Sequence, residues 1–153
     1  MTIKQVDVEE IRSLRSLVLR PGQPKDSTNY EKDNEIPTLH YANIINKKVC
    51  SIATFYPEPM LELKAFNAYR LRGMATHPNY VRRGLARSLM LKAICDIKNL
   101  GGDLIWCKAR LVAIDFYQSI GFLKIGPIYE IDGIGSHYTC LLYTSPSPRD
   151  SSK

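Results

Sequence analysis

The stretch HPNYVRRGLARSLM, residues His77–Met90, holds the densest structural signal in this chain. A strand-like apolar run leads into it, a glycine beside two arginines lies at its centre, and a helical pattern follows. The first amides of a helix have no intrahelical acceptor, and the helix dipole adds partial positive charge there. Since glycine lets the backbone approach a ligand closely, the stretch predicts an anion-binding turn.

Three full positive charges surround this turn. Arg82, Arg83 and Arg87 flank Gly84, so the backbone amides of residues 82–87 are expected to cradle a diphosphate. An ordinary strand–helix turn with solvated arginines has the same local pattern and stays open as an alternative. The turn is neither a Walker loop, because no GK[ST] follows, nor a dinucleotide fingerprint, because G-x-G-x-x-G is absent.

Apolar periodicity on both sides of the turn predicts the order β-α-β-β-β-α-β-α-β-β. The expected strands are residues 2–6, 38–45, 48–56, 68–76, 104–107, 122–125 and 137–142, and the expected helices begin near Val8, at Leu85 and near Ala113. This pattern indicates an α/β fold, a mixed sheet of about six or seven strands flanked by helices, with a right-handed parallel crossover at its centre. Residues 23–36 are polar and aperiodic, and we expect a mobile loop there.

Length and composition indicate a globular protein. The chain has 153 residues and a formal net charge of +6, which favours an anionic partner. We expect one domain over residues 1–142 and a disordered, non-native tail over residues 143–153, where serine and proline replace core-forming residues. No apolar run reaches the length of a membrane span, and the charged N-terminus differs from a secretory signal, so we expect a cytoplasmic protein without membrane partners.

The four cysteines are Cys50, Cys95, Cys107 and Cys140. None forms a CxxC pair, so we expect no metal site. In a reducing compartment they are expected to be small buried apolar residues, and Cys107 in particular is expected to be inert.

Two motifs at a characteristic separation make the chain resemble the GNAT acetyltransferase superfamily. The hallmark [QR]-x-x-G-x-[GA] is similar to residues 81–86, although Val81 stands where glutamine or arginine is usual. ARLVAIDFYQSIGF resembles the A-x-x-F-Y-x-x-x-G-F signature, with Arg110 where asparagine is common. LRGMATHPNY looks like the family's fourth strand and its loop, and VLRPGQP and GIGSH look like features of one small bacterial branch. The resemblance covers roughly residues 3–142.

The resemblance implies acetyl-CoA as the acyl donor. In the family the fourth and fifth strands splay apart, and pantetheine inserts between them and pairs with backbone groups. The implied cofactor-binding residues are Met74, Ala75, Thr76, Arg82, Arg83, Gly84, Leu85, Ala86, Arg87 and Arg110.

Two side chains are candidates for proton transfer. Tyr117 matches the family tyrosine that protonates the CoA sulfur, although helical periodicity also fits a core aromatic. His137 is a candidate acceptor of the amine's proton, and a structural histidine is the alternative. Further candidates for the acceptor side are Glu58, Glu62, Glu130, Asp132 and Arg20, whereas His40 is expected to be structural and His77 is assigned no chemistry.

We therefore expect an N-acetyltransferase that moves an acetyl group from acetyl-CoA directly to a primary amine of a small molecule or a protein. One alternative is a non-catalytic CoA-binding regulatory module. Another is a small basic nucleic-acid-binding protein, which the absence of an interleaved basic-aromatic motif disfavours. Dimers are common in the family, so a homodimer is one expected assembly.

Overall fold

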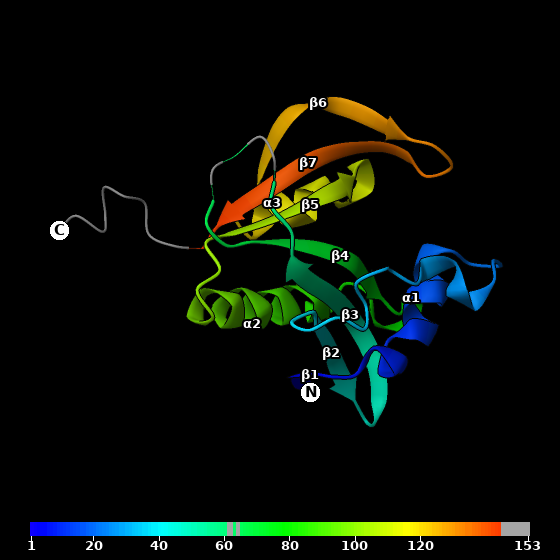
Figure 1. The fold of residues 1–153 in the computed structure, drawn as a ribbon. Helices are drawn as coiled ribbons and strands as arrows, with labels where there is room; N and C mark the ends of the chain where they lie inside the picture. Colours follow the sequence, from blue (N-terminus) through cyan, green and yellow to red (C-terminus); the bar gives the residue numbers. More distant parts are fainter. Residues whose placement is uncertain (61–62, 64, 145–153) are drawn as a thin grey trace. The chain divides into compact units, whose positions relative to one another are not determined.

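A computed structural model describes residues 1–60, 63 and 65–144. It divides into two compact units: unit 1 comprises Met1–Pro57 and Leu71–Ala93, and unit 2 comprises Glu58–Arg70 and Ile94–Lys153. Within the described residues, seven strands and three α-helices follow one another in the order expected from the sequence (Figure 1). The mixed α/β fold class is therefore confirmed.

The first four strands and the second helix lie close to their expected boundaries, whereas the last three strands are longer than expected. The strands are β1 (Thr2–Gln5), β2 (Leu39–Ile45), β3 (Lys48–Pro57), β4 (Ala68–Thr76), β5 (Leu104–Arg110), β6 (Leu123–Ile131) and β7 (Gly135–Tyr143). The helices are α1 (Arg12–Leu19), α2 (Leu85–Asn99) and α3 (Ile114–Ser119). The hydrogen-bonded strand order is β1-β2-β3-β4 through unit 1 and β4-β5-β7-β6 through unit 2, so that β4 contributes to both.

Unit 1 is built on the antiparallel β2–β3 hairpin (Figure 1). Its two-residue turn, Asn46-Lys47, has positive φ at both positions (49° and 65°), as the twist of a tight hairpin requires. The core beside it consists of apolar side chains from α1, the turn before it and the strands, namely Val8, Ile11, Leu14, Ala42, Ile52 and Ala75. The predicted amphipathic helix and hairpin are thus confirmed.

The segment 23–36 is largely exposed, but Thr28 and Asp33 anchor it to the interior of unit 1. Buried Arg15 donates to the Thr28 carbonyl, to both carboxylate oxygens of Asp33 and to the Thr54 hydroxyl. Its guanidinium also lies 4.2 Å from the ring centroid of Tyr30. These contacts pair an otherwise costly buried cation, and they fix a segment whose polar composition suggested solvent exposure.

Unit 2 is a sheet with β5 at its centre. β5 pairs in parallel with the first residues of β4 and antiparallel with β7, which pairs in turn with β6. Leu104–Cys107 is buried throughout, as the continuous apolar run predicted. The hydrophobic cluster of this unit consists of Met60, Ala68, Leu104, Trp106 and Leu141.

The β6–β7 hairpin is longer than the sequence indicated. The ladder is irregular between Ile125 and Tyr129, around Pro127, which has no backbone N–H to donate. This interruption breaks the alternation of apolar residues, so the sequence did not reveal the second half of β6. At the other end β7 continues to Tyr143, and the Thr144 hydroxyl donates to the Gly102 carbonyl; the rest of the expected tail, residues 145–153, lies outside the described residues.

Helix α2 has the predicted buried face. Leu89, Met90, Ala93 and Ile97 are each 0% exposed. Cys50, Cys107 and Cys140 are buried as expected, but Cys95 on this helix is exposed because it lies on the opposite face. Across the described part of the chain, no helix combines the length and the apolar character that a membrane span requires.

Candidate functional site

At the end of β4, the backbone groups of successive residues alternate between facing β3 and pointing away from it. The Cys50 carbonyl accepts from the His77 amide, and the Ala75 carbonyl accepts from the Ser51 hydroxyl at 3.3 Å. Backbone groups of successive strand residues point to opposite sides, so those of Ala75 and His77 face β3. Met74 and Thr76 therefore direct theirs away from β3. Of the three predicted pantetheine-pairing residues, Met74 and Thr76 thus direct their backbone groups away from β3, and Ala75 directs its own towards β3.

The predicted anion-binding turn lies between β4 and α2. Gly84 has φ +74° and is exposed, and a Cβ built on it would meet nothing within 4 Å. Its carbonyl accepts the first helical hydrogen bond from the Ser88 amide, at 3.0 Å. Hence the amides of Leu85 and Ala86 have no intrahelical acceptor. The turn leaves the space above the glycine for an approaching anion.

The positive side chains at this turn are exposed. Arg82, Arg83 and Arg87 all reach solvent, and Arg82 itself has φ +64°. The Arg83 guanidinium lies 5.1 Å from the ring centroid of Tyr80, and the Tyr80 ring packs edge-on against His77. The Leu85 side chain is buried and anchors the first turn of α2. Unit 1 thus brings together the predicted residues 82–87 as one cationic, amide-rich surface.

Tyr117 lies in unit 2, on α3. It is 7% exposed, and its ring packs against Phe116 and Phe122 at centroid separations of 5.3 and 5.4 Å. This packing orients the ring and has the character of a core aromatic. The interpretation as a core aromatic therefore agrees with its position, and the role as a proton donor stays a prediction.

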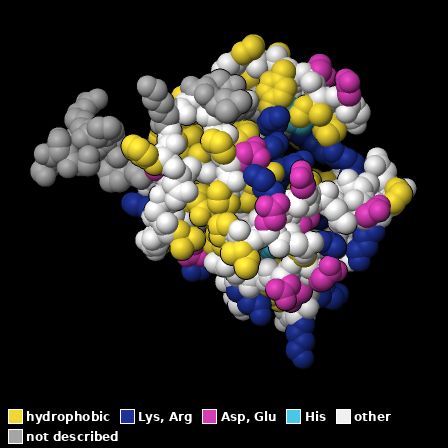
Figure 2. Space-filling model, in the orientation of Figure 1, with side chains coloured by type: hydrophobic (Ala, Val, Ile, Leu, Met, Phe, Trp, Pro, Cys, Tyr) yellow, Lys and Arg dark blue, Asp and Glu magenta, His cyan; other side chains and the backbone are white. Residues whose placement is uncertain are grey.

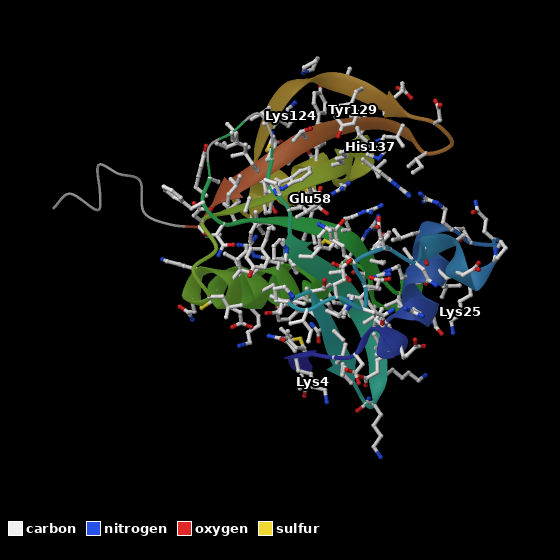
Figure 3. The ribbon with its side chains drawn as sticks, viewed as in Figure 1. Lys4, Lys25, Glu58, Lys124, Tyr129 and His137 are labelled. Atoms are coloured by element: carbon white, nitrogen blue, oxygen red, sulfur yellow. The ribbon has the colours of Figure 1, made fainter. Side chains whose placement is uncertain are left out.

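His137 lies on β7 with a defined tautomer. Its Nδ1 is 2.8 Å from the Gly135 carbonyl oxygen. Because a carbonyl only accepts, a neutral ring carries its proton on Nδ1 and keeps a lone pair on Nε2. The ring stacks on Tyr129 at a centroid separation of 6.1 Å (Figure 3). Arg110, predicted to touch the cofactor, is the register partner of His137 on β5.

A cavity of ≈ 580 Å³ opens beside this pair on unit 2. Its lining includes Glu58, Trp106, Lys108, Ile125, Tyr129 and Thr139. Figure 2 shows hydrophobic side chains over the β6–β7 hairpin and acidic side chains at one end of it. The cavity combines an apolar wall with a few polar groups, as small-molecule sites do.

The polar groups of the cavity are held in place by one another. Glu58 forms an ion pair with Arg70 at 3.1 Å, and the Arg70 guanidinium lies 5.0 Å from the Trp106 ring centroid. The Trp106 indole N–H donates to the Glu58 carbonyl. Burial raises the pKa of the Tyr129 phenol, which keeps its proton available as a donor at neutral pH.

Four further residues were candidates for the acceptor side, namely Arg20, Glu130, Asp132 and Glu62. Arg20 donates to the Leu19 carbonyl at its own helix end. Glu130 accepts from the Ser136 hydroxyl on the β6–β7 hairpin, and Asp132 lies in the hairpin's turn. Glu62 lies outside the described residues. None of the described three is near enough to the cavity to be among its lining residues.

Two thiols face each other on β5 and β7. Cys107 and Cys140 are register partners, and a hydrogen bond between them together with burial raises the pKa of the Cys107 thiol. A thiol with a raised pKa is a poor nucleophile, in agreement with the expectation for Cys107.

Sequence reasoning missed the walls of the cavity. Trp106 fitted the pattern of a core strand, whereas Lys108 and Tyr129 lay beyond the expected ends of strands 104–107 and 122–125. A signal was present in the alternation along β5, where Lys108 and Arg110 follow Trp106 at a spacing of two and share its face.

Comparison with known proteins agrees with this architecture. The model of the Acetyltransferase (GNAT) family matches residues 8–122. The chain is 31% identical over 137 residues to the N-acetyltransferase YitI of Bacillus subtilis (strain 168), covering 90% of this chain and 92% of that protein.

Solved structures share the fold at low identity. An aminoglycoside 6'-N-acetyltransferase complexed with coenzyme A is similar with a TM-score of 0.73 and 12% identity, covering 97% of this chain and 99% of that one. Escherichia coli ElaA is similar with a TM-score of 0.73 and 16% identity, covering 92% and 97%. The family match spans most of the chain and both signature motifs, and the protein is accordingly an acyltransferase that belongs to the GNAT family.

Proposed function

We propose that this acyltransferase moves an acetyl group from acetyl-CoA directly to a primary amine. The observation that carries the proposal is the exposed turn at Gly84, where free space, helix amides and arginines coincide. Such a turn suits the diphosphate of CoA. The backbone groups of Met74 and Thr76 that point away from β3 suit the extended pantetheine arm. The amides of that arm can pair with backbone groups of a strand whatever its side chains are.

The proposed chemistry needs two proton transfers. Acetyl-CoA supplies an activated thioester, whose carbonyl carbon forms a bond with the amine nitrogen as the bond to sulfur breaks. His137 takes the proton that the nitrogen loses, through the lone pair on Nε2 that the Gly135 contact leaves available. Tyr117 donates its phenolic proton to the departing thiolate. An amide of the segment 74–76 stabilises the carbonyl oxygen as negative charge develops.

The proposal is tested in two steps with the full chain. Isothermal titration is expected to show CoA binding that competes with acetyl-CoA. A screen of primary amines that detects the released CoA thiol is then expected to find acceptors. Absence of CoA binding would contradict the cofactor assignment. CoA binding without thiol release from any amine would instead favour a non-catalytic CoA-binding module.

A further inference from the structure

We propose that the cavity of unit 2 binds acceptors that combine an apolar body with a carboxylate, and that Lys108 is the counter-ion of that carboxylate. This inference rests on the proposed function, because it names the class of amine that the transferase uses. It follows from the charges of the cavity rather than from its size. The chemical class is that of apolar amino acids and related amino acid derivatives.

The single carboxylate among the described lining residues is already neutralised. Glu58 is paired with Arg70 at 3.1 Å, and the Arg70 guanidinium is held over Trp106. This pair therefore contributes little net charge to the cavity. A cationic ligand would have to compete with Arg70 for the same carboxylate, which disfavours a polycationic acceptor.

Lys108 differs from Glu58 in that its charge is not neutralised by a described neighbour. Its side chain is exposed at the cavity, and among the residues that the structure describes it has no acidic partner. Arg110 follows on the same face of β5 and also lacks an ion pair with any described acid. The described lining of the cavity therefore has an unpaired positive charge at Lys108, which favours an anionic group on the ligand.

The remainder of the lining suits an apolar body. Ile125 and Pro127 from β6 and the rings of Trp106 and Tyr129 are among the lining residues. Tyr129 separates this wall from His137, on which it stacks. A ligand whose carboxylate pairs with Lys108 can thus lay its side chain against apolar groups.

The positive charge also helps the chemistry. Only a neutral amine attacks a thioester, and nearby cations disfavour the ammonium form of the acceptor. A carboxylate paired with Lys108 supplies binding energy without requiring the nitrogen to be charged. The carboxylate of the ligand then provides tight binding, and its amine remains uncharged for the reaction.

The test compares two ligands of the same shape. N-acetyl-L-phenylalanine carries a carboxylate, whereas N-acetyl-L-phenylalaninamide carries a neutral carboxamide, and both resemble the product. Titration followed by NMR is expected to show the acid binding about 2- to 5-fold more tightly than the amide, the usual range for an exposed charged pair. The preference is expected to shrink as salt is added.

Variants of two lysines locate the effect. Lys108→Met is expected to equalise the two affinities, and Lys108→Arg to keep the preference. Lys124 is the matched control: it lies in the same unit on the opposite sheet face, 4.5 Å from the Tyr138 ring centroid (Figure 3), so Lys124→Met is expected to keep the preference. Equal binding by the unaltered protein, or an equal loss in Lys124→Met, would overturn the inference.

CoA titration of the same samples separates the two proposals. If CoA binds and amines are acetylated but the acid shows no preference, the inference fails and the proposed function stands. If the acid is preferred through Lys108 but CoA does not bind, the proposed function fails, and with it the assignment of the cavity to an acceptor.

Discussion

Arg15 and Asp33 form a two-point ion pair in the interior of unit 1, with Nη1 2.8 Å from Oδ2 and Nη2 3.1 Å from Oδ1. Both side chains are essentially inaccessible, at 0% and 1% exposure. Neither charge can therefore be hydrated when the other is missing. The pair makes the polar segment 23–36 part of the folded unit.

The first prediction concerns this pair. Asp33→Ala leaves the Arg15 charge buried without its partner, so the free energy of unfolding is expected to fall by about 3–5 kcal/mol. Urea denaturation followed by circular dichroism measures the change. The surface pair Arg12–Glu9 is the control, and Glu9→Ala is expected to cost less than about 1 kcal/mol. Similar losses in both variants would show that the buried pair has no special role.

The second prediction is a pH dependence of stability. His40 contacts the Thr54 hydroxyl through Nδ1 and the Asp33 carbonyl through Nε2. Burial lowers the pKa of His40 in the folded protein, and the nearby Arg15 and Arg12 charges act in the same direction. Because the unfolded chain then binds a proton more readily, stability is complete above the ordinary histidine pKa and falls as the pH drops towards the lower folded value.

Urea denaturation at pH 7.5 and at pH 5.5 tests this sign. The unaltered protein is expected to lose more stability between these two values than His40→Gln does. The difference between the two proteins is the relevant quantity, since other groups titrate in both. A larger loss in His40→Gln would contradict the assignment.

The third prediction concerns the turn before α2. Gly84→Glu places a carboxylate in the space above a backbone with φ +74°, where it repels a diphosphate and strains the turn. CoA affinity is expected to fall at least about tenfold, the effect of roughly 1.4 kcal/mol. Asn is the matched control because it tolerates positive φ without a charge, so Gly84→Asn is expected to lose less affinity. Unchanged binding in folded Gly84→Glu would refute the phosphate site.

The fourth prediction separates chemistry from packing at Tyr117. Tyr117→Phe keeps the ring contacts with Phe116 and Phe122 and removes the phenolic hydroxyl. Turnover is expected to fall by about 10²-fold, the lower range for general acid catalysis, while the Kd of acetyl-CoA changes little. Steady-state kinetics and titration together decide the matter. If turnover is unaffected, Tyr117 serves packing alone.

The fifth prediction concerns His137. His137→Asn keeps a group able to donate to the Gly135 carbonyl but has no nitrogen lone pair to accept a proton. kcat/KM for an amine acceptor is expected to fall by about 10²-fold, while the Kd of acetyl-CoA changes little. Unchanged turnover would assign the base to another group.

Local features were predictable from the sequence, and features that join distant segments were not. Gly84, its arginines and the apolar face of α2 lie within one stretch, so periodicity and turn chemistry identified them. Arg15 and Asp33 are 18 residues apart, and no local pattern distinguishes a buried ion pair from two solvated charges. The sequence therefore indicated a loop but not the contact of Asp33 with Arg15 that anchors it.

The cavity escaped prediction for a related reason. Trp106 and Tyr129 come from different strands, and the irregular register near Pro127 concealed the extent of β6. His137 was identified as a candidate from its side chain alone. Its tautomer and its stacking on Tyr129 depend on the β6–β7 register, which one sequence does not determine.

The ring of Tyr30 lies between two guanidinium groups, with Arg15 at 4.2 Å and Arg72 at 3.9 Å from its centroid. Gly73 beneath it has φ +66°, and a methyl group there would come within 3.1 Å of the ring. A chimera that imports residues 23–36 from another protein must therefore import a matching aromatic and leave Gly73 untouched. A donor loop without an aromatic residue at this position leaves both guanidinium groups without their ring contact, and the hybrid is expected to be less stable than the unaltered protein.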